Sequence, residues 1–334
     1  MRIGVTYDLR SDYLAMGYGE EETAEFDAEE TIVAICNALS GLGHKPVRIG
    51  GIRKLAEALV KGERWDAVFN ICEGLKGVAR EAQVPALLEA YDIPYVFSDP
   101  LTLSASLDKA VAKRIVRDCG VATPDFAVIA SPGDADKISL PYPLFLKPNS
   151  EGSGKGVDAK SKVGNAAELK DVAAELLARF RQPVLVETFL PGREFTVGIT
   201  GTGADAEILG ITEIARTDKF IGDGYGYQNK EYWEDKVVIR LCEDANARAA
   251  GETALAAWRA LNCRDGGRVD IREDANGRPH FIEVNPLAGL RPDYSDLCFI
   301  ANFKAVAYQD LIGKIVVSFL KRHPELSAKG RAAA

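Results

Sequence analysis

The feature that most constrains the fold is a pair of segments, residues 268–271 and 282–286, in which apolar and polar side chains alternate. Alternation with a period of two is typical of a β-strand that has one face in a core. Between the segments, the sequence Asp-Ala-Asn-Gly at 274–277 favours a tight turn. The pattern predicts two paired strands, which would bring residues far apart in the sequence onto one surface.

The polar side chains of these two strands are suited to binding a metal ion. Arg268 and Asp270 share one face of the first strand, and Glu283 and Asn285 share one face of the second. If both faces point the same way, two carboxylates, an amide oxygen and a guanidinium meet in one place. Hard oxygen ligands of this kind suit Mg²⁺, which prefers one or two carboxylates together with substrate phosphates. The alternative is the polar face of a solvated hairpin.

A glycine-rich loop follows a predicted strand that ends at Lys147. Residues 149–156, with the sequence Asn-Ser-Glu-Gly-Ser-Gly-Lys-Gly, contain three glycines and Lys155. Glycines let backbone N–H groups approach an anion closely, and the two lysines add positive charge. The loop matches neither GxxxxGK[ST] nor GxGxxG, which excludes the two commonest phosphate-binding motifs. The alternatives are an anion-binding loop of another kind and an ordinary surface turn.

Residues 183–197 contain two apolar segments separated by a Pro-Gly pair. One strand is predicted to end at Glu187, and a second is predicted to begin at Glu194. The pattern fits an ordinary hairpin. It also fits a hinge whose backbone contacts the edge of an adenine, with Glu194 accepting hydrogen bonds from ribose hydroxyls.

Hydrophobic periodicity predicts alternating strands and helices in the first hundred residues, which is typical of a small doubly wound α/β unit. The predicted strands lie at residues 2–7, 45–49, 66–71 and 94–97, with helices at 31–42, 55–61 and 83–91. Longer helices are predicted at 106–119, 166–180 and 246–261. The chain is expected to divide into three parts, residues 1–100, 101–183 and 184–334.

Composition excludes several function classes. A net charge of −8, with no basic stretch, argues against a nucleic-acid partner. No apolar run reaches the length of about 18–20 residues that a membrane helix needs, so no membrane partner is expected. The chain is expected to open on a strand and to have no signal peptide, and its six cysteines lack CxxC spacing. They are expected to be buried free thiols of a cytoplasmic protein.

Taken in order, these motifs resemble the ATP-grasp superfamily and, within it, the D-alanine–D-alanine ligases. The matching segments are 147–148, 151–153, 184–187, 191–197, 268–270 and 283–286, and residues 108–113 are similar to the family's lysine-bearing helix. The resemblance implies an ATP-grasp fold, α/β with α+β parts. Its N-terminal domain would be doubly wound α/β, and ATP would bind between the central and C-terminal domains.

The resemblance also implies an ATP-dependent carboxylate–amine ligase that joins two amino acids through an acyl phosphate. Its implied cofactors are ATP and Mg²⁺, with Mn²⁺ as an alternative metal. The implied nucleotide-binding residues are Lys109, Lys147, Glu151, Gly152, Ser153, Glu187, Phe189, Leu190, Glu194 and Lys230. The implied metal ligands are Asp270, Glu283 and Asn285, and the implied catalytic residues are Arg268, Gly289, Ser153 and Glu25.

The segments that would bind amino acids depart from the family pattern. The residues expected to line that pocket are Glu25, Glu73, Arg80, Arg291 and Ser295. Glu25 is the best match for the glutamate that meets the first substrate's ammonium. Glu73 stands where the family has histidine, and it either faces a substrate ammonium or caps a helix. Arg291 either binds a substrate carboxylate or pairs with Asp293.

Residues 212–236 are expected to form a long loop that closes over the site as a lid, with Glu231 in place of the family's lid tyrosine. Three function classes remain open. They are a D-alanine–D-alanine ligase of peptidoglycan synthesis, a ligase of other amino acids in specialised metabolism, and a non-catalytic ATP-binding regulator. Small amino acids are the expected partners, and the family suggests a homodimer.

Overall fold

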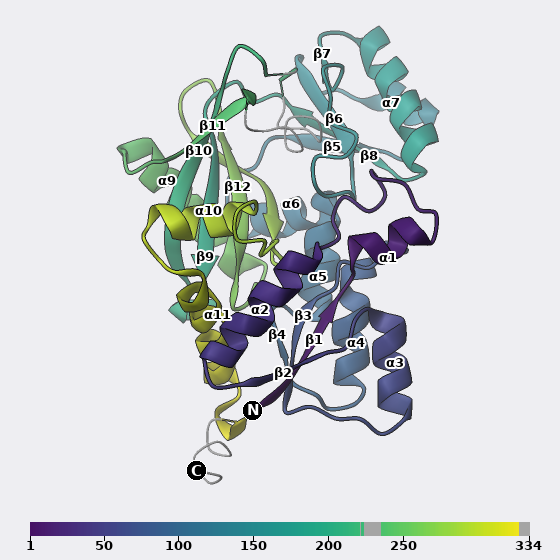
Figure 1. Ribbon diagram of the computed structural model, residues 1–334. Helices are drawn as coiled ribbons and strands as arrows, with labels where there is room; N and C mark the ends of the chain where they lie inside the picture. Colours follow the sequence, from purple (N-terminus) through teal and green to yellow (C-terminus); the bar gives the residue numbers. More distant parts are fainter. Residues whose placement is uncertain (221, 224–234, 327–334) are drawn as a thin grey trace.

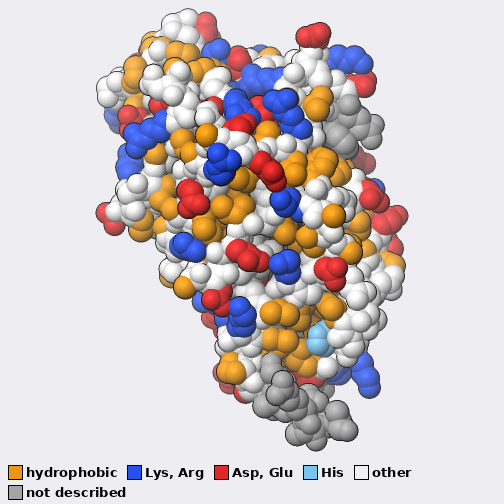
Figure 2. Space-filling model, turned by 90° about the vertical axis from the view of Figure 1, so that its left-hand side faces the viewer, with side chains coloured by type: hydrophobic (Ala, Val, Ile, Leu, Met, Phe, Trp, Pro, Cys, Tyr) orange, Lys and Arg blue, Asp and Glu red, His pale blue; other side chains and the backbone are white. Residues whose placement is uncertain are grey.

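The computed structural model describes residues 1–220, 222–223 and 235–326. Within these residues the chain forms three β-sheets, each covered by helices (Figure 1). No helix in the described part of the chain is long and apolar enough to cross a membrane. Figure 2 shows acidic and basic side chains mixed over one face of the molecule, with hydrophobic groups between them.

The N-terminal sheet is parallel, with the strand order β2-β1-β3-β4. Its strands are β1 (Arg2–Tyr7), β2 (Lys45–Arg48), β3 (Ala67–Ile71) and β4 (Tyr95–Val96). The elements between the strands are α1 (Arg10–Ala15), α2 (Glu29–Gly41), α3 (Ile52–Val60), the 3₁₀ turn Arg80–Ala82 and α4 (Gln83–Glu89). Side chains of β3 alternate between two cores: Phe69 packs with α2, and Val68 packs with α3 and α4. Helices on both faces confirm the predicted doubly wound unit.

The central sheet is antiparallel, with the order β5-β8-β6-β7. It consists of β5 (Phe126–Ile129), β6 (Leu144–Pro148), β7 (Lys162–Val163) and β8 (Val184–Thr188), and it is covered by the 3₁₀ turn Pro132–Lys137 and by α7 (Ala166–Phe180). The side chain of Asn165 caps α7 by accepting from the N–H groups of Ala167 and Glu168. Since β8 belongs to this sheet, the central part extends past residue 183, where the sequence placed its end.

The C-terminal sheet has the order β11-β10-β9-β12-β13. Its strands are β9 (Glu194–Thr200), β10 (Glu207–Arg216), β11 (Val237–Leu241), β12 (Gly266–Glu273) and β13 (Pro279–Asn285). One face packs on α9 (Ala245–Ala260), and the other packs on α10 (Asp296–Phe303) and α11 (Tyr308–Arg322). A 3₁₀ turn, Gly203–Asp205, links β9 to β10. Because α11 also packs on α2, the N-terminal and C-terminal parts share a core.

Three expectations require correction. The helix predicted at 106–119 is two helices, α5 (Pro100–Leu107) and α6 (Lys109–Asp118). Asp108 between them is extended, and its side chain caps α6 by accepting from the N–H of Val111. The loop predicted from residue 212 begins later, because β10 continues to Arg216. Cys119, expected to be buried, is exposed, although all six cysteines are free.

The two strands predicted within residues 183–197 do not form a hairpin. β8 lies in the central sheet and β9 in the C-terminal sheet, so the chain between them connects two parts of the molecule. At Gly192 the backbone of this connection passes close to Glu273, because a Cβ there would lie 2.7 Å from the carbonyl oxygen of Glu273. The hinge interpretation is therefore the one that the sheet topology supports.

Candidate active site

The strands β12 and β13 pair as the sequence predicts. Asp270 lies directly opposite Glu283, and Arg268 lies opposite Asn285. The register shifts just beyond this point, and the resulting bulge lets both Phe281 and Val284 reach the core under α9. The four polar residues consequently remain together on the other face, which also carries α10.

Hydrogen bonds and ion pairs hold the carboxylates of this hairpin. Asp270 Oδ1 accepts from the hydroxyl of Thr196 at 3.0 Å, and its other oxygen accepts from the guanidinium of Arg268. Glu283 Oε2 lies 3.6 Å from Lys109 Nζ. Neighbouring elements therefore fix both carboxylates before any ligand binds.

The donor set of the hairpin fits Mg²⁺ bound together with phosphates. The described part of the chain contains no group of three or more His, Cys, Asp or Glu residues that could hold a metal ion. Two carboxylates and the amide of Asn285 are too few for a self-contained site, but they match a metal that takes its other ligands from substrate. The Asn285 nitrogen is buried without a hydrogen-bond partner among the described residues, so nothing there opposes the amide turning its oxygen to a cation.

A cavity between the central and C-terminal sheets brings most of the predicted nucleotide-binding residues together. The predicted residues that line it are Lys109, Lys147, Glu151, Glu187, Phe189, Leu190, Glu194, Asp270 and Glu283. Lys155 of the glycine loop also lines it, as does Arg272, to which the sequence assigned no role. The cavity lies where the ATP-grasp resemblance implies that ATP binds.

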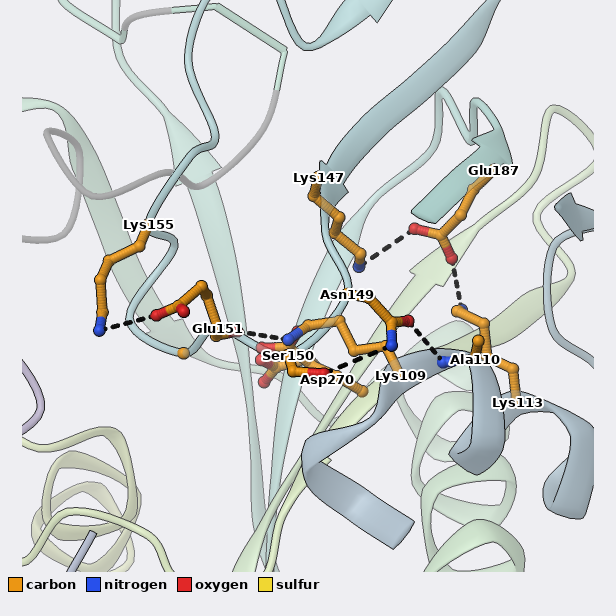
Figure 3. A network of polar contacts seen from close by, with 12 residues as sticks. Lys109, Ala110, Lys113, Lys147, Asn149, Ser150, Glu151, Lys155, Glu187 and Asp270 are labelled. Atoms are coloured by element: carbon orange, nitrogen blue, oxygen red, sulfur yellow. Dashed lines mark hydrogen bonds and ion pairs between the residues drawn. The ribbon is translucent and has the colours of Figure 1, made fainter. Parts of the chain in front are cut away.

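The floor of this cavity is a buried charge cluster (Figure 3). Glu187 on β8 pairs with Lys147 on β6, at 3.1 Å, and with Lys113 on α6, at 2.5 Å. Burial alone would raise the pKa of Glu187, but the two ammonium groups hold it below its ordinary value. Burial lowers the pKa of Lys113 to about 8. Sequence reasoning missed Lys113, although its place four residues after Lys109 puts both on one helix face.

An aromatic ring and a guanidinium line the side of the cavity next to the hinge, and a lysine lies over the same ring. The Arg272 guanidinium lies 5.0 Å from the centre of the Phe189 ring, and Lys162 Nζ lies 4.4 Å from it. Arg272 Nη1 is 3.6 Å from Glu194 Oε2. The Arg272 guanidinium lies over the face of the Phe189 ring, and both line the cavity, so this side offers flat surfaces of the kind on which a heteroaromatic group stacks.

The glycine loop is tied to the N-terminal part of the chain through Glu25. One oxygen of Glu25 accepts from the N–H of Gly152 at 2.7 Å and lies 3.4 Å from Lys155 Nζ. The other accepts from Arg80 at 3.1 Å. Burial alone would raise the pKa of Glu25, but Arg80 and Lys155 keep it below its ordinary value. A Cβ at Gly152 would lie 2.4 Å from this carboxylate, so a larger residue would require Glu25 or the loop to shift.

The start of the same loop is also held by Lys109 on α6. Its ammonium donates to the carbonyl oxygen of Glu151, and the Glu151 carboxylate pairs with Lys155 at 2.9 Å. Ser153 has a φ of 51°, in the left-handed region that residues with a Cβ rarely adopt. The loop is therefore held by contacts with Glu25 in the N-terminal part and with Lys109 on α6.

A second cavity adjoins the first across the glycine loop and the hairpin. The predicted residues that line it are Glu25, Glu73, Gly152, Ser153, Arg268, Asn285, Gly289, Arg291 and Ser295. Arg80 does not line it. Arg80 lies behind Glu25, and it donates to the carbonyl oxygen of Ser150 at 2.9 Å. Arg80 is placed to position Glu25 and the loop, whereas the sequence predicted that it contacts substrate.

The contacts of Glu73 and Arg291 bear on the alternatives left open for them. Glu73 caps no helix in the described part of the chain. The Arg291 guanidinium makes no ion pair with Asp293, and instead lies 5.4 Å from the centre of the Tyr294 ring. Ser295 closes this turn, with its hydroxyl accepting from the N–H of Arg291 at 3.0 Å. Both side chains therefore remain available on the cavity wall.

Three carboxylic residues on this wall were not foreseen as site residues. Asp27, Glu81 and Asp296 line the second cavity, and Asp296 pairs with Arg268 at 3.3 Å. Asp27 and Glu81 lie far from the motifs that carry the family resemblance. Only the fold brings them to the wall, so no sequence signal marked them. The predicted lid residues Lys230 and Glu231 lie outside the described residues.

Comparison with known proteins identifies the family. Residues 115–317 match the family described as D-ala D-ala ligase C-terminus. A D-alanine–D-alanine ligase of Cupriavidus pinatubonensis is 31% identical over 331 residues, which cover 97% of this chain and 93% of that one. The chain belongs to the D-alanine–D-alanine ligase family. Another member, from Bordetella petrii, is 33% identical over 270 residues, covering 80% of this chain and 79% of its own.

Solved structures show the same relationship to the D-alanine–D-alanine ligase family. The D-alanine–D-alanine ligase from Bacillus anthracis superposes with a TM-score of 0.74 at 25% identity, covering 97% of this chain and 99% of its own. The same enzyme complexed with ATP superposes with a TM-score of 0.73 at 24% identity. The ATP-grasp fold and membership of an ATP-dependent ligase family, both implied by the sequence motifs, are confirmed.

Proposed function

We propose that this chain uses ATP to join two amino acids through a peptide bond, with D-alanine as the first candidate for both. One observation carries the proposal. The β12–β13 hairpin serves two adjoining cavities: Asp270 and Glu283 line the first, and Arg268 and Asn285 line the second. A phosphate held in the first cavity therefore lies next to a carboxylate held in the second, as phosphoryl transfer to an amino acid requires.

The first cavity is suited to MgATP. Lys109 and Lys147 would neutralise the phosphates, and Glu151, Gly152 and Ser153 would cover them with the glycine loop. The adenine would lie against the hinge at Phe189 and Leu190 with Glu187, and Glu194 would accept from the ribose hydroxyls. Asp270, Glu283 and Asn285 would hold Mg²⁺, which neutralises phosphate charge and orients the transferred group.

The second cavity is suited to the two amino acids. The carboxylate of the first would receive the γ-phosphoryl group and become an acyl phosphate. The amine of the second would attack that carbonyl and release phosphate. Arg268 and the N–H of Gly289 line this cavity and would stabilise the negative oxygen of the tetrahedral intermediate; loss of one such donor commonly lowers the rate by about 10²–10³.

Other functions fit less well or need a further observation. A non-catalytic ATP-binding regulator is disfavoured, because the phosphate lysines, the metal carboxylates and the oxyanion donors all converge on adjoining cavities. A ligase for other amino acids is favoured by the unforeseen carboxylates of the second cavity. If D-alanine is the substrate, a role in peptidoglycan synthesis and a cytoplasmic location follow from that assignment, and a homodimer is expected by family analogy.

Two measurements test the proposed function. Calorimetry with a non-hydrolysable ATP analogue in millimolar magnesium is expected to show binding. ADP release is then measured with ATP, magnesium and a panel of D- and L-amino acids that includes D-alanine. We expect turnover of at least one amino acid at about 1–10³ per second, the range of a dedicated enzyme. A folded protein that binds the analogue but releases no ADP with any amino acid would refute the proposal.

A further inference from the structure

The wall of the second cavity carries more carboxyl groups than the chain itself pairs with basic groups. Asp27, Glu73 and Glu81 all line this cavity, and none of them makes an ion pair in the described part of the chain. The carboxylate of Glu25 on the same wall is already neutralised by Arg80 and Lys155. The wall therefore presents three carboxyl groups outside any ion pair among the described residues, although burial raises the pKa of Glu81 and Arg80 and Lys109 lie near enough to offset part of that rise.

Two of the three arginines that line the cavity are paired with carboxylates of the chain. Arg10 pairs with Glu20 at 2.5 Å, outside the cavity. Arg268 is held between Asp270 and Asp296. Arg291 is the remaining arginine on the lining, and its guanidinium rests on Tyr294. A carboxylate of the second substrate would need that guanidinium, which leaves the three carboxyl groups unmatched.

The position of Glu73 is fixed by the backbone that follows β3. Gly74 has a φ of 69°, and a Cβ there would lie 2.6 Å from the carbonyl oxygen of Arg80. Its N–H also donates to Asp8 Oδ2 at 2.9 Å. Glu73 therefore projects from a backbone held on both sides, which suits a residue that recognises a ligand rather than one that moves freely.

A buried hydroxyl on the same wall lies next to one of these carboxyl groups. Thr31 is fully buried on α2 and lines the cavity. Its Oγ1 makes no hydrogen bond of normal geometry in the described part of the chain. Buried polar atoms in folded proteins nearly always have a partner. Burial raises the pKa of Asp27 and the Thr31 hydroxyl offsets part of that rise, so a substrate group bound at Asp27 would also meet Thr31.

We propose that Glu73, supported by Glu81 and Asp27, binds an ammonium group on the side chain of a substrate. At least one of the two substrates would then be a diamino acid. This inference rests on the proposed function. A single α-ammonium pairs with one carboxyl group and leaves the others unmatched, whereas a second ammonium, on the side chain, would pair with another carboxyl group of the wall. Burial raises the pKa of Glu73, and that of Glu81 to about 7, as expected for carboxyl groups that lack a bound cation.

The test compares amino acids matched in length but differing in one side-chain charge. ADP release is measured with 2,4-diaminobutyrate against 2-aminobutyrate, and with ornithine against norvaline, each as D- and L-forms, alongside D-alanine. We expect kcat/KM for a diamino acid to exceed that of its uncharged match by about tenfold or more, as for a desolvated charge-assisted hydrogen bond.

A pair of variants assigns the effect to Glu73. Glu73→Gln keeps the side-chain size and is expected to remove the preference for the diamino acid, with the KM for ATP unchanged. Glu30→Gln, an exposed position on α2, is the matched control and is expected to leave the preference intact. A Glu73→Gln variant that loses activity equally with charged and uncharged amino acids would overturn the inference, because Glu73 would then bind an α-ammonium or support the fold.

The outcomes also separate this inference from the proposed function. Turnover of D-alanine as efficient as that of any diamino acid would overturn the inference and leave the ligase function standing. No ADP release with any amino acid, from protein that binds the ATP analogue, would refute the ligase function and the inference with it. A preference that Glu73→Gln abolishes would support both.

Discussion

The two cavities of this protein differ in how their charges are balanced. In the nucleotide cavity, each carboxylate faces a basic group: Glu187 pairs with Lys113 and Lys147, and Glu283 lies near Lys109. In the amino-acid cavity, Glu73 and Glu81 have no such partner in the described part of the chain. The first is preorganised for a ligand that the whole family shares, whereas the second needs its ligand to complete the charge balance. The difference predicts that changes in the two cavities affect different substrates.

The largest effect is expected at the hairpin, which serves both cavities. Glu283→Gln removes a carboxylate placed to hold a metal, and we expect kcat for ADP release to fall by more than about tenfold, because charge on the phosphates is then poorly neutralised. Thermal melting without nucleotide should barely change, which serves as the folding control. A folded variant that keeps more than about a tenth of wild-type turnover would contradict the metal assignment.

A somewhat smaller effect is expected at the loop that separates the cavities. Gly152→Ala would place a methyl group 2.4 Å from the Glu25 carboxylate, so the loop or Glu25 must shift. We expect kcat/KM to fall by about tenfold for both ATP and amino acid, because misplacing a catalytic loop by an ångström commonly costs that much or more. Gly133→Ala, where the added methyl group meets nothing within 4 Å, is the matched control. An active Gly152→Ala variant would show that the loop tolerates displacement.

The sequence predicts the nucleotide cavity better than the amino-acid cavity, for a physical reason. Lys147, Glu187 and Asp270 lie in short motifs whose local pattern sets both the strand and the direction of the side chain. Asp27 and Glu81 lie in segments without such a pattern, and only the packing of the N-terminal part against the glycine loop brings them to the site. Arg80 illustrates the same limit: its residue type suggested a carboxylate ligand, but its nearest carboxylate is Glu25 of the chain itself.

The helices and strands show the same limit: local sequence predicts an element well only where a local pattern sets it. The helix over residues 166–180 has the predicted bounds, since Asn165 caps its start and its apolar side chains repeat at helical spacing. The break at Asp108 was missed, because a residue with a good capping side chain can also lie within a helix. The separation of β8 from β9 into different sheets was not decided by local sequence, since strand partners are chosen by tertiary contacts.

Substitution of Arg291 tests whether a substrate carboxylate binds in the amino-acid cavity. Arg291→Ala is expected to raise the apparent KM for the second amino acid by about tenfold, the usual effect of losing a charge-assisted hydrogen bond, and to leave the KM for ATP unchanged. Arg291→Lys should restore only part of the loss, because a lysine cannot form two parallel hydrogen bonds. Equal effects on ATP and amino acid would remove Arg291 from the site.

The smallest effect is expected at the edge of the nucleotide cavity, where Glu194 provides the counterpart of the Arg291 test. Glu194→Gln keeps the shape and one acceptor oxygen but removes the charge that faces Arg272 at 3.6 Å. Since Glu194 is only partly buried, solvent screens that pair, and the main loss is the strength of the hydrogen bonds to ribose. We expect the KM for ATP to rise by about three- to tenfold, as for weakening a charge-assisted hydrogen bond, while the KM for each amino acid stays the same. Steady-state ADP release with either substrate varied measures both constants. A rise in the amino-acid KM equal to that for ATP would mean that the two cavities are coupled through the hinge and do not bind their ligands independently.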